Sequence, residues 1–356
     1  MSPIDRLGLA HPIFQAPMAG VSTPAMAVAV SEAGALGAIA VGAVGAAAAG
    51  DLMAQVRAGT RRAFNVNLFV HAPPRRDTTR ESAWLEALRP LFAAFDAEPP
   101  ATLTSPYLSF AEDDAMLARL VAEPPPVVSF HFGLPDARRI AALKQAGCVL
   151  VSTATSLAEA QAARDVGVDL VVAQGYQAGG HRGVFDADAP DERLDTLSLV
   201  RRLSRDAGLP VVAAGGLMDG RDIRAALDAG VVAAQLGTAF LLTPESAADA
   251  AYRAVLVSDA ARHTVMTDAV SGRPARSVRS LFTDWGAGTS LPRPDYPVAY
   301  DAGKALNAVA RAAGQPGYGA LWAGEGAPRL RAGTAAQIIT ELARELADAD
   351  VQPPRN

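Results

Sequence analysis

The chain is short of several residue types, and each shortage excludes a class of function. Its 356 residues include one cysteine, Cys148, which rules out an intrachain disulfide and any site built on several cysteines. The five histidines show no spacing that suggests a metal site. The net charge is −5 and no basic stripe is visible, which argues against nucleic acid as a partner. No G-x-x-x-x-G-K-[ST] motif is present, and no G-x-G-x-x-G follows the first predicted strand, so neither a P-loop nor a Rossmann site is supported.

Signals for export and for membrane insertion are also missing. The first ten residues have no charged region followed by an apolar one. The stretch 33–50 is uncharged and approaches the length that spans a bilayer, but it is mostly alanine and glycine. We interpret it as a strand, a turn and the start of a helix. We therefore expect a cytoplasmic protein that does not contact a membrane.

Short apolar runs recur along the chain and alternate with helical segments. Half of the residues are hydrophobic, and eight runs begin near residues 13, 36, 64, 127, 148, 170, 211 and 231. Eight buried strands alternating with helices predict an α/β protein, a TIM (β/α)8 barrel. A doubly wound open sheet is the structural alternative.

Two segments interrupt this rhythm and define the predicted domains. The barrel would occupy residues 1–243, with an insertion at about 71–126, where proline pairs and a proline triple mark loops. Residues 244–331 lack the alternation, and we expect a smaller, mainly helical domain that covers the substrate. Residues 332–356 are predicted to include a last helix that packs back on the barrel.

The segment 171–185 joins a buried strand to a glycine-rich loop. It reads V-V-A-Q-G-Y-Q-A-G-G-H-R-G-V-F and contains four glycines. Within it, only His181 readily gains or loses a proton near neutral pH. Barrel enzymes carry their active sites in loops at the carboxyl ends of strands, so this loop is a candidate site. The alternative is a surface turn with an incidental histidine.

The last two predicted strands end in residues that suit a phosphate group. Strand seven ends A-A-G-G at 213–216, and strand eight ends Q-L-G-T at 235–238. Their glycines can present bare backbone N–H groups, and Thr238 adds a hydroxyl. Because barrels often bind phosphate after strands seven and eight, we predict a phosphate-bearing ligand here.

Several motifs, taken in order, resemble the nitronate monooxygenases, formerly called 2-nitropropane dioxygenases, and most of all their bacterial class I branch. They are Q-A-P-M-A-G-V-S-T-P (15–24), F-N-V-N-L-F-V-H (64–71), V-S-T-A-T-S (151–156), Q-G-Y-Q-A-G-G-H-R-G (174–183), A-A-G-G (213–216) and L-W-A-G-E-G (321–326). The resemblance implies an FMN-binding barrel. Gln177 departs from the pattern, since many members have glutamate there, and this bears on fine specificity.

The resemblance also implies a cofactor site. The FMN phosphate would lie on the glycine-rich ends of strands seven and eight, and the side chains of Asn67 and Gln174 would hydrogen-bond the flavin. Met18 would lie against the ring, and Gly179 would let the backbone approach the cofactor. The predicted cofactor-binding residues are Met18, Asn67, Gln174, Gly179, Gly215, Gly216, Gln235, Leu236, Gly237 and Thr238.

By the same resemblance, the reaction oxidises an anionic alkyl nitronate, such as propionate 3-nitronate, with O2 to a carbonyl compound and nitrite, without a metal. His181 is the predicted catalytic residue, which would hold the nitronate oxygens as an imidazolium or as a neutral donor. In relatives that accept neutral nitroalkanes, the matching histidine acts as a base. The predicted substrate-binding residues are His131, Tyr107, Tyr296, Tyr300 and Lys304.

Other functions stay open from the sequence. An FMN-dependent NAD(P)H:quinone reductase or enoyl-acyl-carrier-protein reductase would use the same barrel. A lyase or isomerase acting on a phosphorylated compound is a further alternative, and a non-catalytic ligand-binding module is another. The expected partners are small molecules, and a homodimer is the candidate assembly.

Overall fold

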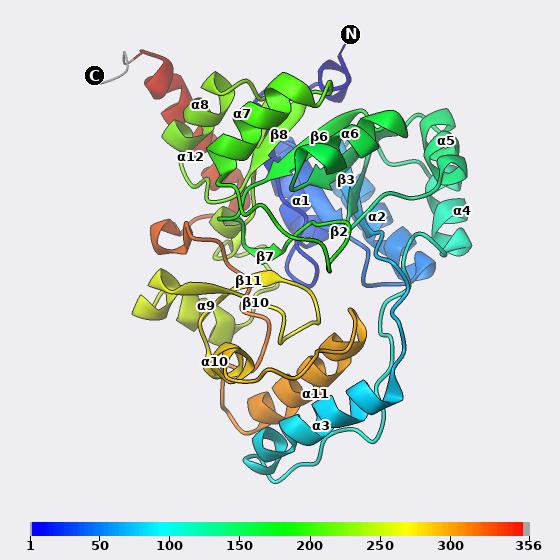
Figure 1. Ribbon diagram of the computed structural model, residues 1–356. Helices are drawn as coiled ribbons and strands as arrows, with labels where there is room; N and C mark the ends of the chain where they lie inside the picture. The colour runs from blue at the N-terminus through cyan, green and yellow to red at the C-terminus, as the bar shows by residue number, and fades with distance from the viewer. Residues whose placement is uncertain (1, 352–356) are drawn as a thin grey trace.

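The eight apolar runs form eight parallel strands of one sheet in the computed structural model, which describes residues 2–351 (Figure 1). The strands are β1 (Ile13–Gln15), β2 (Gly37–Ala40), β3 (Phe64–Phe69), β4 (Val127–His131), β5 (Val149–Ala154), β6 (Leu170–Gln174), β8 (Val211–Ala214) and β9 (Ala233–Leu236). Their order is β1-β9-β8-β6-β5-β4-β3-β2. A parallel bridge between Phe14 and Leu36 joins the two ends, so the sheet closes. The predicted TIM barrel is confirmed, and the open doubly wound sheet is excluded.

Side chains from both faces of these strands are buried, which is why the strands read as continuous apolar runs. Alternate residues point in opposite directions. Val149 and Val151 belong to the cluster inside the barrel, whereas Leu150 belongs to the cluster between the strands and the surrounding helices. The barrel interior is therefore a packed core at this level, and a cavity has room only beyond it.

Helices cover the outside of the barrel: α1 (Pro24–Glu32), α2 (Ala46–Gly59), α4 (Asp114–Ala122), α5 (Ala137–Gln145), α6 (Leu157–Asp165), α7 (Thr196–Asp206) and α8 (Gly220–Asp228). Most of them begin at a side-chain cap. The Thr23 hydroxyl accepts a hydrogen bond from the Met26 N–H at 3.1 Å, with Pro24 at the first helical position, as the sequence predicts. Among residues 2–351, no helix is long and apolar enough to cross a membrane.

The eighth outer helix comes from a distant part of the chain. Helix α12 (Ala335–Val351) packs against α8 and α1. The Glu345 carboxylate accepts a hydrogen bond from the N–H of Gly220, the first residue of α8, at 2.9 Å. A Cβ at Gly220 would lie 2.3 Å from the backbone nitrogen of Leu346, so glycine permits this close approach. The ring of helices is thus completed after the chain has left the barrel and returned.

The smaller body lies below the barrel in Figure 1 and is formed mainly by elements that follow β9 in the chain. Its elements are α9 (Ala250–Leu256), β10 (Thr264–Thr267), β11 (Ala275–Val278), α10 (Leu281–Ala287) and α11 (Val298–Ala312). Helix α3 (Thr78–Ala93), from the insertion after β3, packs against α11, and its Trp84 shares a buried cluster with Phe282 and Leu306. Helix α4, from the same insertion, lies against α2 and α5 instead. We therefore propose that the insertion is divided between the barrel and the smaller body.

A second sheet joins the smaller body to the glycine-rich loop. Strand β7 (Gly180–His181) pairs antiparallel with β11, which in turn pairs with β10. His181 lies opposite Ala275, and the Arg182 N–H donates to the Pro274 carbonyl at 2.8 Å. The sequence analysis predicted none of these three strands. They hold the loop that carries His181 against a segment far away in the chain.

Candidate functional site

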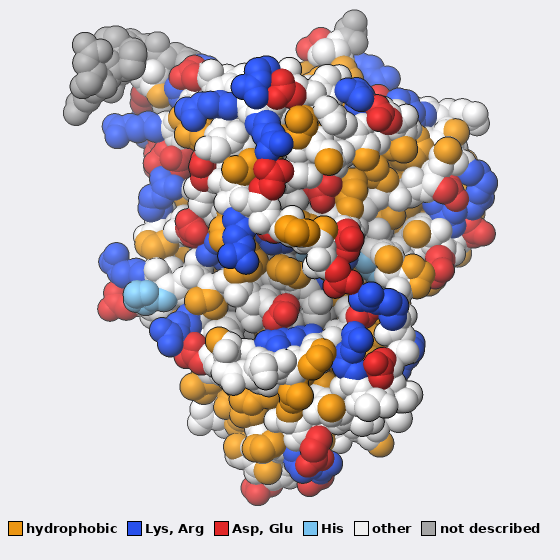
Figure 2. All heavy atoms as spheres, in the orientation of Figure 1, with side chains coloured by type: hydrophobic (Ala, Val, Ile, Leu, Met, Phe, Trp, Pro, Cys, Tyr) orange, Lys and Arg blue, Asp and Glu red, His pale blue; other side chains and the backbone are white. Residues whose placement is uncertain are grey.

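The carboxyl ends of the barrel strands surround a cavity of about 490 Å³, which the smaller body covers from the other side. Figure 2 shows the molecule hollowed between these two parts. All residues predicted for the cofactor and the substrate line this cavity: Met18, Asn67, Tyr107, His131, Gln174, Gly179, His181, Gly215, Gly216, Gln235, Leu236, Gly237, Thr238, Tyr296, Tyr300 and Lys304. The structure therefore brings them together, while their individual roles stay predictions.

One end of the cavity presents backbone N–H groups that are not used within the protein. Among residues 2–351, the N–H groups of Gly216, Gly237 and Thr238 have no protein acceptor. Gly215 and Gly216 have φ angles of +125° and +70°, which side-chain-bearing residues rarely adopt. The Thr238 hydroxyl accepts from the Gly324 N–H at 3.0 Å. Several free donors converging at one place form an anion-binding site.

Gly179 has a packing role that the sequence analysis did not foresee. A Cβ at this position would lie 2.4 Å from the backbone nitrogen of Gly324. The glycine-rich loop therefore touches the L-W-A-G-E-G segment directly. This contact closes the cavity on the side of the predicted phosphate site.

Two carboxamides line the cavity and are engaged differently. The Asn67 amide N–H group donates to the Ser129 hydroxyl at 2.9 Å and to the Ser129 carbonyl at 3.3 Å, and neither bond uses the carboxamide oxygen. Gln174 donates to the His181 carbonyl at 2.9 Å and accepts from the Gly183 N–H at 2.7 Å. Gln174 thus holds the glycine-rich loop, and its predicted hydrogen bond to the flavin could use its second amide N–H, because the Arg182 guanidinium also lies 3.5 Å from its oxygen.

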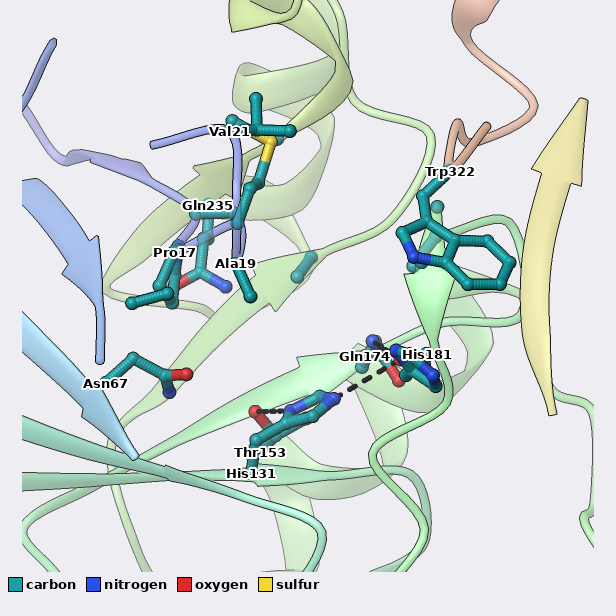
Figure 3. A pocket seen from close by; sticks show the side chains of 18 of the residues that line it. Pro17, Ala19, Val21, Asn67, His131, Thr153, Gln174, His181, Gln235 and Trp322 are labelled. Carbon is teal, nitrogen blue, oxygen red and sulfur yellow. Dashed lines mark hydrogen bonds between the residues drawn. The ribbon is translucent and has the colours of Figure 1, made fainter. Parts of the chain in front are cut away.

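His131 uses both ring nitrogens within the protein (Figure 3). Its Nε2 lies 3.2 Å from the His181 carbonyl, which can only accept, so Nε2 carries the proton. Its Nδ1 lies 3.0 Å from the Thr153 hydroxyl, which must then donate to it. Burial lowers the pKa of His131 to about 4, so the ring is neutral at neutral pH. His131 can contact a substrate with its ring face, but both nitrogens are occupied.

His181 stands among aromatic rings at the cavity wall. Its ring centroid lies 5.1 Å from that of Trp322, 5.4 Å from that of Phe132 and 5.5 Å from that of Tyr296. Its Nε2 lies 2.8 Å from the hydroxyl of Ser271. Burial lowers the pKa of His181 to about 3, so the neutral imidazole is favoured over the imidazolium that the sequence analysis considered.

Lys304 provides positive charge at the substrate end. Its Nζ lies 4.3 Å from the ring centroid of Tyr107 and 5.1 Å from that of Tyr300, the residue one turn earlier on α11. These two ring faces stabilise the ammonium form. Partial burial lowers the pKa of Lys304, and the Asp301 carboxylate opposes this effect. No carboxylate lines the cavity within residues 2–351, so its only charged side chain there is this cation.

Arg273 is a buried cation close to the site that the sequence analysis missed. Its guanidinium carbon lies 4.6 Å from the ring centroid of Phe132, and its Nη2 donates to the backbone carbonyl of Val184. In the described structure no carboxylate lies within ion-pair distance of it, and burial lowers its pKa to about 10. Phe132, which it covers, has a φ of +78° and also contacts the rings of His131 and His181. A charge buried so near the cavity raises the local potential.

Three other residues of the site were not predicted. The Tyr252 hydroxyl donates to the Trp322 carbonyl, and both residues line the cavity. Trp322 belongs to the L-W-A-G-E-G motif, but the sequence assigns it no role at the site. Ser271 lies in a turn before β11, and no local pattern distinguished it from other serines. Only the pairing of β11 with β7 reveals its proximity to His181.

Comparison with known proteins gives consistent results. A family model described as nitronate monooxygenase matches residues 3–345. A protein from Paraburkholderia phytofirmans named nitronate monooxygenase is 53% identical, covering 96% of this chain and 93% of its own. One of the same name from Pseudomonas aeruginosa is 50% identical, covering 96% and 97%.

Solved structures are similar over nearly the whole chain as well. The structure described as a nitroalkane oxidase from Streptomyces ansochromogenes has a TM-score of 0.89 and 39% identity, and the match covers 98% of this chain and 99% of that chain. FabK from Thermotoga maritima has a TM-score of 0.74 and 28% identity, covering 97% and 96%.

Proposed function

Because this chain belongs to the nitronate monooxygenase family, and is thus an oxidoreductase, we propose that it uses FMN to oxidise alkyl nitronates with O2, giving a carbonyl compound and nitrite. Propionate 3-nitronate is the substrate that we would test first. The observation that supports this most directly is the polarity of the cavity. Free backbone donors of the barrel loops, the Lys304 ammonium group on α11, and neutral aromatic and imidazole rings all line the same cavity.

The residues present fit FMN. The N–H groups of Gly216, Gly237 and Thr238 are free to bind the phosphate, and a cavity of about 490 Å³ is within the range of cofactor sites. The Asn67 oxygen, which neither hydrogen bond of its side chain uses, can accept a hydrogen bond from the ring system, and Met18 lines the same cavity. When bound, FMN supplies the one-electron chemistry that links the nitronate to O2.

Lys304 would bind the nitronate through its negative charge, which is delocalised over the nitro oxygens. The cation–π contacts with Tyr107 and Tyr300 fix the ammonium group near the cavity, so little ordering is required when substrate binds. Burial raises the pKa of the Tyr107 and Tyr300 hydroxyls, which therefore stay protonated and can donate hydrogen bonds. The absence of a lining carboxylate within residues 2–351 removes a source of repulsion for an anion.

His181 would contact the substrate on the opposite wall, beside Trp322 (Figure 3). As a neutral ring it shapes the pocket without adding charge, and it can take up a proton from a protonated form of the substrate. The surrounding aromatic rings exclude water, which strengthens the attraction between Lys304 and the anion.

The proposal is tested by measuring O2 consumption by the purified protein with propionate 3-nitronate in the absence of nicotinamide. We expect a yellow protein with a flavin spectrum, rapid O2 uptake and release of nitrite. A colourless protein that cannot be reconstituted with FMN would contradict the cofactor assignment. Oxidation of NAD(P)H with a quinone or an enoyl thioester, and no nitronate turnover, would instead support the reductase alternative.

A further inference from the structure

The side chain of Ser271 makes three polar contacts that together fix the direction of its hydroxyl proton. Its oxygen lies 2.8 Å from the His181 Nε2, 3.2 Å from the Arg273 carbonyl and 3.4 Å from the Arg273 N–H. A carbonyl can only accept and a backbone N–H can only donate. All three contacts are satisfied together only if the Ser271 proton is directed to the carbonyl and its lone pairs accept from the Arg273 N–H and from a protonated His181 Nε2.

This arrangement has a consequence for the imidazole. If the Ser271 oxygen accepts a hydrogen bond from the His181 Nε2, then Nε2 must carry the single proton of the neutral ring. The reverse arrangement, with Ser271 donating to Nε2, would leave the buried Arg273 carbonyl without this partner. Ser271 is fully buried, so water cannot replace the lost contact at low cost.

The other ring nitrogen of His181, Nδ1, opens onto the cavity. It has no protein partner in the described structure, yet it is not among the fully buried polar atoms that lack one. The rings of Phe132, Tyr296 and Trp322 surround the imidazole. Nδ1 is thus the atom that a bound substrate meets.

We propose that Ser271 is a positioning residue that holds neutral His181 in the tautomer protonated at Nε2, so that the nitrogen facing the cavity carries a lone pair. His181 can then accept a proton from a ligand but cannot donate a hydrogen bond to it. For a nitronate, the oxygens would be directed to Lys304, and Nδ1 would face a protonated position of the substrate. This last consequence rests on the proposed function.

The tautomer is measured directly by nitrogen NMR of the purified protein labelled with 15N-histidine. The chemical shifts of the two ring nitrogens distinguish a protonated nitrogen from an unprotonated one, and the His181→Asn variant identifies the His181 signals. We expect Nε2 protonated and Nδ1 unprotonated in the wild-type protein at neutral pH. In Ser271→Ala we expect a mixture of both tautomers. A wild-type ring protonated at Nδ1, or an identical spectrum in Ser271→Ala, would overturn the proposal.

Ser277→Ala is the matched control, because Ser277 is equally buried in the same segment but bonds only to backbone carbonyls. It should leave the His181 signals unchanged. With nitronate as substrate, Ser271→Ala should lower kcat about tenfold and change KM little, since a misoriented group costs rate more than binding. Equal effects of both serine variants on kcat would show a packing role only. The NMR result does not depend on turnover, so it tests Ser271 even if the protein fails to oxidise nitronates.

Discussion

His181 and Lys304 line the same cavity, but one side chain is neutral and the other is positively charged. The imidazole is buried among aromatic rings and is neutral, whereas the ammonium group lies over two tyrosine rings and carries charge. We therefore propose that different side chains bind the anion and exchange the proton. Each can be changed without removing the other, and this allows their contributions to be separated.

Replacing His181 with asparagine should retain FMN and lose most nitronate turnover. Asparagine keeps a polar group of moderate size, but it lacks the ring that packs against Trp322 and cannot accept a proton. We expect kcat/KM to fall by roughly 100-fold, which is in the range for loss of a proton-transfer group. Flavin content is measured by absorbance and turnover by O2 uptake. Unchanged turnover would remove His181 from the mechanism.

Replacing Lys304 with methionine should mainly weaken substrate binding. The variant keeps the packing against Tyr107 and Tyr300 but loses the only charge on the described cavity wall. Loss of one partly buried charge contact corresponds to roughly 1–2 kcal/mol, or about a tenfold rise in KM for the nitronate. Lys304→Arg is the control and should retain most of the affinity. An equal KM in the methionine variant would show that the anion binds elsewhere.

The sequence predicted most of the important residues that line the cavity, but not Ser271 and Arg273, which contact the lining residues from outside it. Gln174 ends β6, Asn67 lies in the second half of β3, and Met18 follows β1, and the order of the parallel strands places these positions on one side of the barrel. Ser271 and Arg273 come just before β11, and β11 pairs with the glycine-rich loop only in the folded chain. Periodicity reports which face of an element is buried, and it contains no information on such long-range pairing.

At the scale of the element, the β8–α8 loop is the part of the barrel that should control cofactor binding. Gly216→Asp should reduce FMN content strongly, because it places a negative charge beside the phosphate donors and strains a backbone with a φ of +70°. Gly314→Asp is a matched control with a φ of +71°, in open space after α11. It introduces the same side chain and similar strain. Full FMN occupancy in the Gly216 variant would place the phosphate elsewhere.

The strands of the barrel could be predicted from the sequence, whereas the helices and strands of the smaller body could be predicted only in part. Each barrel strand is apolar on both faces, which gives a strong signal in a short run. Strand β10 is half-exposed and β7 has two residues, so neither has a pattern that differs from a loop. Helix α11, in contrast, begins at Val298 and carries two of the predicted substrate-binding residues, Tyr300 and Lys304, one turn apart.

For the molecule as a whole, the partly buried, neutral side chains of His131 and His181 predict a loss of stability in mild acid. Burial lowers the pKa of His131 to about 4 and of His181 to about 3, whereas unfolded histidine titrates near pH 6.5. As the pH falls below about 6.5, the unfolded chain binds protons that the folded chain does not, so the free energy of unfolding falls.

The expected slope is roughly 1.4 kcal/mol per pH unit for each histidine between about pH 6.5 and pH 4.5. Urea unfolding with saturating FMN near pH 7.5 and near pH 5.5 measures it. His131→Asn should reduce the difference between the two pH values, whatever its effect on stability at neutral pH. An unfolding free energy that does not change between these pH values would show that the two rings are protonated in the folded protein.

Because α12 packs on the barrel but comes last in the chain, the residues that line the cavity and the helix that completes the outer layer are synthesised at different times. A chain that grows from its N-terminus completes β9, then the whole cover over the cavity, and only afterwards the helix that shields the apolar side chains of α1 and α8. While the ribosome is still adding residues 335–351, every residue that lines the cavity has already been synthesised. The outer layer of helices still lacks α12 at that point. The residues that line the cavity are therefore synthesised before helix α12, which completes the outer layer of the barrel.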